Sequence, residues 1–178
     1  MRALMVYESM FGNARDVATT IAEGLARRCE IELAEISAAP SVPGRNVDLL
    51  IVGGPTLALG IGRPQTRSDA DGTTASIVTR NIGLREWIAN LPMTPSHMAA
   101  ATFDTRVRVR GLPGSAARGA ARRLRQRGYR VLDRPETFYV TEVSGPLVVG
   151  ELVRARAWGH RIGVDLVNGK RLGPTTAV

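Results

Sequence analysis

Short apolar runs and helix-period stretches alternate along the first part of the chain. Residues 3–7 form a nearly all-apolar run, as expected of a strand that is covered on both faces. From about Asn13 to Arg28, apolar residues recur at four-residue spacing, which predicts a helix with one buried face. Residues 30–36 alternate between polar and apolar and predict an edge strand, whereas residues 47–52 are the most hydrophobic run and predict a central strand.

The second part of the chain continues the alternation after a long irregular stretch. Residues 57–82 show no clear period and predict a long loop. The elements predicted after it are a helix at 84–91, a strand at 98–103, a helix from its N-cap Ser115 to Gly128, a last strand in two pieces at 129–132 and 137–140, and a helix at 151–162. We expect a single domain over residues 1–168 and a flexible tail over residues 169–178.

This order of elements predicts an α/β fold. Strands separated by helices imply right-handed crossovers, and therefore a five-stranded parallel sheet with helices on both faces. Such sheets bind ligands beyond the carboxyl ends of the strands, where the strand order reverses. That rule points to three loops, at residues 8–14, 55–67 and 103–114.

The first of these loops has the chemistry of an anion site. It leads directly into a predicted helix, whose amino end exposes unpaired N–H groups and carries a partial positive charge. Gly12 allows a tight turn close to a ligand, and Ser9 and Asn13 can donate hydrogen bonds. The loop contains no lysine and matches neither the triphosphatase nor the dinucleotide fingerprint. These features favour a phosphate monoester that stays bound over a phosphate that is transferred.

Three segments resemble the flavodoxin family. The loop Ser9-Met10-Phe11-Gly12-Asn13 is similar to the phosphate loops of flavodoxins and of the related tryptophan-repressor-binding-type quinone reductases. Val52-Gly53-Gly54-Pro55-Thr56 is similar to the start of the loop beside their flavin ring. Gly145-Pro146-Leu147, with Glu151 and Trp158-Gly159, is similar to their chain endings. The resemblance implies a flavodoxin-like three-layer sandwich with strand order 2-1-3-4-5, and FMN as the cofactor.

The resemblance also implies which residues bind FMN. The phosphate would be wrapped by Ser9, Met10, Phe11, Gly12, Asn13 and Ala14. One side of the isoalloxazine ring would be covered by Pro55, Thr56, Leu57 and Ala58. The edge of the ring would be lined by Phe103, Asp104, Thr105 and Arg106.

Two features of the sequence depart from the family pattern. Ala14 stands where the family usually has a hydroxyl, which removes one hydrogen bond to the phosphate. Flavodoxins usually hold the ring between aromatic side chains, but the second loop has none and the third has only Phe103.

Charge and composition limit the partners. The 178 residues carry a net charge of +8, and every basic residue except Lys170 is arginine. Residues 106–134 contain ten arginines and one acid, Asp133, which indicates either a surface that docks an acidic redox partner or a solvated helix face in an arginine-rich proteome. Because no aromatic residue lies between Phe103 and Tyr129, we do not expect nucleic-acid binding.

The same composition indicates a cytoplasmic protein. No stretch has the roughly twenty apolar residues of a membrane span, so no membrane contact is expected. The single cysteine, Cys29, excludes an internal disulfide and a multi-cysteine metal site.

The sequence leaves three functional hypotheses. The first is an FMN-binding electron-transfer protein, in which the flavin supplies the redox chemistry and no side chain acts as a catalytic acid or base. The second is an FMN-dependent NAD(P)H reductase of quinones or similar acceptors. The third is a flavodoxin-fold binding module that has lost flavin.

Overall fold

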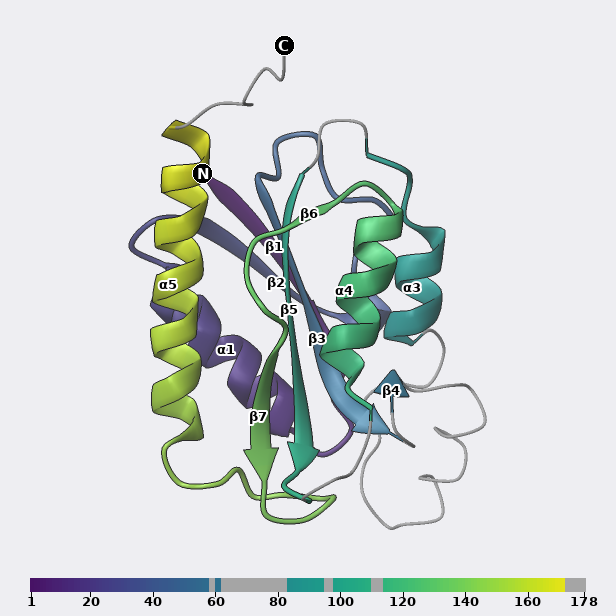
Figure 1. Cartoon of the computed structure of the whole chain (residues 1–178), viewed down its shortest axis with the longest axis vertical. Helices are drawn as coiled ribbons and strands as arrows, with labels where there is room; N and C mark the ends of the chain where they lie inside the picture. Colours follow the sequence, from purple (N-terminus) through teal and green to yellow (C-terminus); the bar gives the residue numbers. More distant parts are fainter. Residues whose placement is uncertain (58–59, 62–82, 95–97, 110–113, 172–178) are drawn as a thin grey trace.

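A parallel sheet lies at the centre of the computed structural model, which describes residues 1–57, 60–61, 83–94, 98–109 and 114–171 (Figure 1). Its strands are β1 (Arg2–Tyr7), β2 (Glu30–Glu35), β3 (Leu49–Leu57), β5 (Ala99–Val107), β6 (Arg130–Val131) and β7 (Glu136–Val140). They follow the order β2-β1-β3-β5, and β6 and β7 both pair with β5 as two pieces of one last strand. The short β4 (Gly60–Ile61) pairs antiparallel with the end of β3. The predicted order 2-1-3-4-5 is therefore confirmed.

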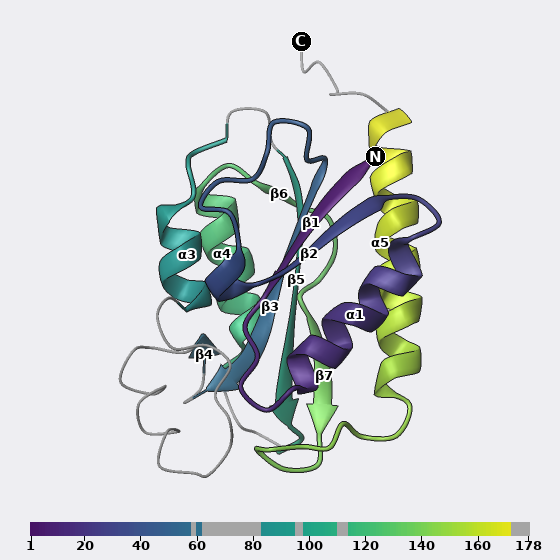
Figure 2. The same ribbon diagram turned by 180° about the vertical axis from the view of Figure 1, so that it is seen from behind.

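Helices cover both faces of the sheet, as predicted. The helices α1 (Asn13–Leu25) and α5 (Glu151–Arg171) lie on one face, and α3 (Leu84–Asn90) and α4 (Ala116–Gln126) lie on the other (Figures 1 and 2). A 3-10 turn, η1 (Ile36–Ala38), follows β2. Successive side chains of β1 point to opposite faces, so Met5 packs in the core under α1 and α5 and Leu4 in the core under α3 and α4. Among the described residues, no helix is long and apolar enough to cross a membrane.

Both central strands extend further than the sequence predicts. The Gly53-Gly54-Pro55 segment has the composition of a turn, yet it continues β3, because Gly54 pairs with Asp104 and Pro55 with Thr105 in β5. Gly53 allows the Phe103 ring to lie over the strand, since a Cβ atom there would be 2.2 Å from Phe103 Cε1. The predicted loop boundaries at residues 55 and 103 were therefore wrong: the strands run on to Leu57 and Val107.

The final helix is also longer than predicted. It passes the predicted end at Ile162 and runs to Arg171, because Leu166 continues the buried face. The beginning of the expected tail, residues 169–171, is therefore helical. The rest of that tail and most of the 57–82 segment lie outside the described residues.

Two glycines bring α1 and α5 into direct backbone contact. A Cβ atom on Gly24 would lie 2.2 Å from the carbonyl oxygen of Arg156, and one on Gly159 would lie 2.3 Å from the carbonyl oxygen of Ile21. Backbone atoms cannot rotate away as side chains can. The spacing of the two helices therefore depends on the absence of side chains at these positions.

We expect Gly159→Ala to destabilise the protein, although alanine favours a helix by roughly 0.8–1 kcal/mol over glycine. Separating α1 from α5 should cost about 1–3 kcal/mol, as other overpacking substitutions do. Gly163→Ala is the matched control in the same helix, because its nearest neighbour is the flexible Arg28 side chain at 3.0 Å. Denaturant midpoints should fall for Gly159→Ala and stay level or rise for Gly163→Ala. Equal midpoints for the two variants would contradict this account of the contact.

Candidate functional site

Helices α1, α3, α4 and α5 begin near the carboxyl edge of the sheet, the lower end in Figure 1. This is the edge at which parallel α/β sheets bind ligands. Each helix presents N–H groups that its own backbone cannot satisfy. The side chains that satisfy these groups decide which helix end remains open to an anion.

The amino end of α3 is occupied by a buried carboxylate of the chain. Glu8 is only 2% exposed, and its Oε2 accepts a hydrogen bond from the Leu84 N–H at 2.9 Å. The carboxylate of Glu86 accepts a second one from the Gly83 N–H at 3.2 Å. Negative side chains therefore already complement the positive end of this helix.

A second buried carboxylate fills the amino end of α4. Asp104 is fully buried, and its Oδ2 accepts hydrogen bonds from the Ala117 N–H at 3.0 Å and from the Ser115 hydroxyl at 2.6 Å. The Thr56 hydroxyl donates to the same oxygen at 2.8 Å and accepts from the Ala116 N–H at 2.9 Å. Asp104 thus joins β3, β5 and α4, which explains why this helix starts where it does.

The N-cap of α4 confirms the prediction from the sequence. The Ser115 hydroxyl accepts a hydrogen bond from the Arg118 N–H at 3.1 Å. Together with Thr56 and Asp104, it gives three successive amides of the first turn a side-chain acceptor. No amide of this turn is left to hold a ligand.

The amino end of α1 remains open. Gly12 precedes the helix in the left-handed conformation, with φ 88°, and offers no side-chain cap. The buried Ser9 hydroxyl accepts a hydrogen bond from the Arg15 N–H at 3.3 Å, and the Gly12 carbonyl accepts from the Asp16 N–H at 3.0 Å. The N–H groups of Asn13 and Ala14 have no acceptor among the described residues. This helix end can therefore receive an external anion.

A small, open pocket lies beside this helix end. It brings together most of the residues that the sequence singled out. Those that line it are Ser9, Met10, Phe11, Asn13, Ala14, Pro55, Thr56, Thr105 and Arg106. Gly12 forms the turn between them, and Leu57 ends β3. Ala58 lies outside the described residues.

Two residues of the predicted ring edge lie elsewhere. Phe103 is fully buried in the core, where its ring centroid is 6.2 Å from that of Phe138 and 6.5 Å from that of Trp158. Asp104 is buried as the cap of α4. Both lie inside β5, so their side chains point into the two cores of the sandwich, and the structure does not place them in the pocket.

The pocket also contains residues that the sequence reasoning missed. Val107, Val140 and Val143 line it beside the carboxyl ends of β5 and β7. The last strand was predicted, and the rule that ligands bind at carboxyl ends applies to it as well, so Val140 could have been found. Phe11 is the single aromatic side chain among the lining residues that the structure describes, and the walls at Val107, Val140 and Val143 are aliphatic.

Arg106 carries the positive charge of the pocket. It lies near the end of β5, and its Nη1 donates a hydrogen bond to the carbonyl oxygen of Gly114, just before α4. This contact holds the guanidinium between the pocket and the start of α4.

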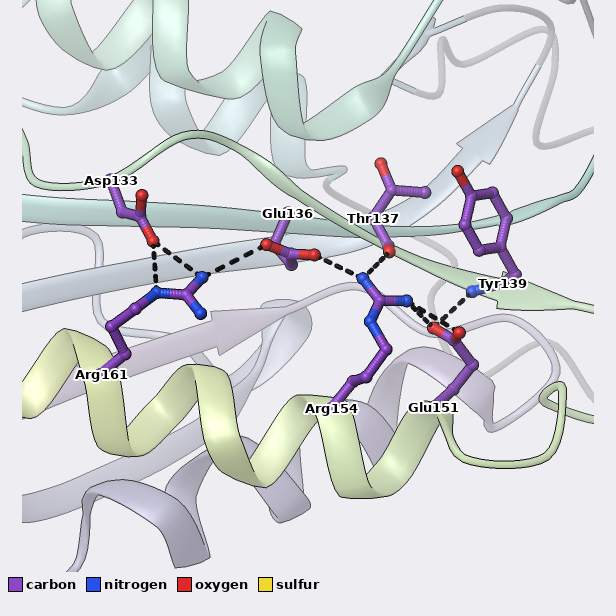
Figure 3. Close-up of polar contacts among 7 residues, drawn as sticks. All are labelled: Asp133, Glu136, Thr137, Tyr139, Glu151, Arg154 and Arg161. Carbon is purple, nitrogen blue, oxygen red and sulfur yellow. Dashed lines mark hydrogen bonds and ion pairs between the residues drawn. The ribbon is translucent and has the colours of Figure 1, made fainter.

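A polar network fixes β7, the strand that carries Val140, against α5 (Figure 3). Glu151 is 6% exposed, and its carboxylate accepts hydrogen bonds from the Tyr139 N–H at 3.0 Å and from Arg154 Nη1 at 2.6 Å. Arg154 Nη2 donates to the Thr137 carbonyl at 3.2 Å. Side chains of α5 thus satisfy backbone groups of β7 at the edge of the sheet. Unsatisfied backbone groups at such an edge could pair with another chain.

The acidic partners of Arg154 strengthen this network. Burial alone would lower the pKa of the Arg154 guanidinium, but hydrogen bonds with Glu151 and the charges of Glu151 and Glu136 outweigh burial and raise the pKa. Arg161 extends the network by pairing with Asp133 at 3.0 Å and with Glu136 at 3.5 Å (Figure 3).

We expect Glu151→Gln to destabilise the protein by about 1.5–3 kcal/mol, the range for hydrogen bonds to charged groups. The neutral amide can still accept from Tyr139 but cannot pair with Arg154. Glu23→Gln is the matched control, because the ion pair of Glu23 with Arg156 is solvent-exposed and such pairs contribute little. The free energy of unfolding from urea titrations should fall only for Glu151→Gln. A loss of equal size in both variants would show that burial does not strengthen the network.

The strand order and the open helix end define a flavodoxin-like α/β protein. No family model matches the sequence, and no curated protein matches it either. Among solved structures, a flavodoxin from the domain Archaea superposes with a TM-score of 0.64 at 16% identity, covering 94% of this chain and 99% of its own. Oxidised Flavodoxin 1 from Bacillus cereus gives 0.65 at 18% identity, covering 94% and 98%. A WrbA-like flavodoxin from Agrobacterium tumefaciens gives 0.57 at 17%, covering 94% and 98%. These likenesses establish the fold.

Proposed function

We propose that this protein binds FMN by its phosphate at the amino end of α1 and serves as an electron-transfer protein. One observation carries the proposal. Among the helices that begin at the carboxyl edge, α3 and α4 are capped by buried carboxylates of the chain, whereas α1 keeps the Asn13 and Ala14 amides open beside the pocket.

The open end of α1 beside the pocket favours a ligand with one phosphate group. A pyrophosphate or a second phosphate would need further donors, and the carboxylates of Glu8 and Asp104 repel anions from the neighbouring helix ends. The flavodoxins among the structural neighbours support the same interpretation through their fold. FMN, a flavin with one phosphate monoester, fits both observations.

The remaining pocket residues would position the ring. Pro55, Val140 and Val143 provide apolar walls, and Arg106 adds a positive charge. FMN, when bound, supplies the redox chemistry. The role of the chain is then to hold the cofactor and set its electrostatic surroundings, and we propose no catalytic side chain.

The position of Phe103 favours a second candidate. Because this aromatic residue packs in the core, the pocket has less ring contact than a flavodoxin usually offers. A module that binds another phosphate monoester without flavin would need only the α1 site. A third candidate is an FMN-dependent quinone reductase, which the resemblance of the loop at residues 9–13 to quinone reductases implies and which predicts steady NAD(P)H turnover by the purified protein.

FMN titration against the apoprotein, followed by flavin fluorescence, tests the proposal. Riboflavin is the control because it carries the same ring without the phosphate. We expect FMN to bind at least about 100-fold more tightly, since two charge-assisted hydrogen bonds contribute roughly 3–6 kcal/mol together. Equal affinities would show that the α1 site does not hold the phosphate. No binding of either flavin, with binding of a simpler phosphate monoester, would favour the flavin-free module.

Substituting Ala14 provides a sharper test of the same site. Ala14 lines the pocket in the first turn of α1, where the family resemblance expects a hydroxyl. We expect Ala14→Ser to tighten FMN binding by roughly tenfold, because it adds one hydrogen bond to a charged acceptor. Riboflavin affinity should not change. An equal gain for both ligands would place the phosphate away from residue 14.

A further inference from the structure

The outer face of α4 is a row of arginines. The helix contains four arginines and no acid. Arg118, Arg122 and Arg125 are exposed, while the opposite side of the helix is buried in the core through Ala117, Ala120, Ala121 and Leu124. The spacing of i, i+4 and i+7 places the three exposed charges along one side of the helix. We call Arg118, Arg122 and Arg125 the basic face.

In the described part of the chain, these charges lack the acidic partners that the arginines of α5 have. On α5, Arg154 pairs with Glu151, Arg156 with Glu23, and Arg161 with Asp133. No acid in the described part of the chain lies within ion-pair distance of the arginines of α4. An arginine-rich composition explains how many arginines the chain has. It does not explain why one helix face carries them without acids.

Repulsion among the positive charges of α3 and α4 also indicates that this surface favours an anionic partner. Burial lowers the pKa of the half-buried Arg123 guanidinium, and the charges of Arg85 and Arg122 lower it further, with only Glu86 opposing them. The positive groups of α3 and α4 therefore repel one another in the free protein. An anionic surface placed against them would relieve that repulsion.

The basic face begins next to the candidate cofactor site. Arg106 lines the pocket and donates to the Gly114 carbonyl, and Arg118 lies in the first turn of the helix that follows. With a rise of 1.5 Å per residue, the face extends about 10 Å from Arg118 to Arg125. In Figure 1, α4 lies in the outer layer, with its amino end beside the ends of β3 and β5.

We propose that the basic face docks an acidic protein, and that this protein exchanges electrons with the cofactor. The second part rests on the proposed function; the docking itself does not. A protein fits better than a nucleic acid because the nearest large aromatics, Trp87 and Tyr129, are 5% and 4% exposed and offer no surface for stacking bases. A second copy of the chain is disfavoured, since each copy carries a net charge of +8.

The test measures binding of a labelled acidic helical peptide, with glutamates along one face, by fluorescence anisotropy. One variant carries Arg118→Gln, Arg122→Gln and Arg125→Gln. Its matched control carries Arg27→Gln, Arg45→Gln and Arg134→Gln at exposed positions outside α4. Both triples lower the net charge equally, from +8 to +5. We expect the first triple to weaken binding at least about tenfold, which corresponds to three surface pairs, and the control by less than about threefold.

Two results would overturn the docking proposal. Equal losses in the two triples would show that net charge alone attracts the peptide. The basic face would be assigned to nucleic acid if a single-stranded oligonucleotide of matched charge bound more tightly than the peptide and lost that affinity in the first triple variant. FMN affinity measured on the same proteins separates this proposal from the proposed function. Absence of FMN binding in the unsubstituted protein would refute the redox role, but it would not change the conclusion on docking.

Discussion

The candidate anion site depends on which helix ends are capped by buried carboxylates of the chain. Helices α1, α3, α4 and α5 begin at one edge of the sheet, and the positive amino end of a helix attracts anions. Glu8 and Asp104 neutralise two of these ends from inside the protein, through hydrogen bonds of 2.9 and 3.0 Å to the amides of Leu84 and Ala117. The end of α1, at Gly12, has no acidic cap and opens onto the pocket. This difference is the basis for the proposed phosphate site at α1.

The same two carboxylates also hold the edge together. Glu8 follows β1 and reaches the start of α3, while Asp104 lies in β5 and binds Thr56 of β3 as well as α4. Removal of either acid would leave helix amides without acceptors and open a second positive site. These two acids therefore contribute both to the stability of this edge and to the charge at its helix ends.

The aromatic residues illustrate a second constraint. Gly53 leaves room for the Phe103 ring, which packs edge-on against Phe138 and Trp158 between the sheet and α5. A core rich in alanine needs such large side chains to fill it. The ring that the family resemblance assigns to the cofactor edge is consequently used for packing, and aliphatic side chains line the pocket instead.

Much of the fold could be predicted because its signals are local. The alternation of apolar runs with four-residue periods identified the strands and helices, and Gly12 followed by Asn13 marked the anion loop. The errors in strand length arose where pairing between distant strands overrides a local turn signal. Gly53-Gly54-Pro55 has the local signature of a turn, but partners in β5 keep it in the sheet. The roles of Phe103 and Asp104 depend on the core and on α4, which no local pattern near residue 103 reveals.

The most direct measurement is an amide NMR titration of the labelled protein with FMN. The account predicts that the largest early shifts fall on the amides of Gly12, Asn13 and Ala14, and that those of Leu84, Ala116 and Ala117 change little because side chains already occupy them. Large shifts at the amino ends of α3 or α4, with none at α1, would contradict the central claim that this protein leaves one helix end open for a phosphate.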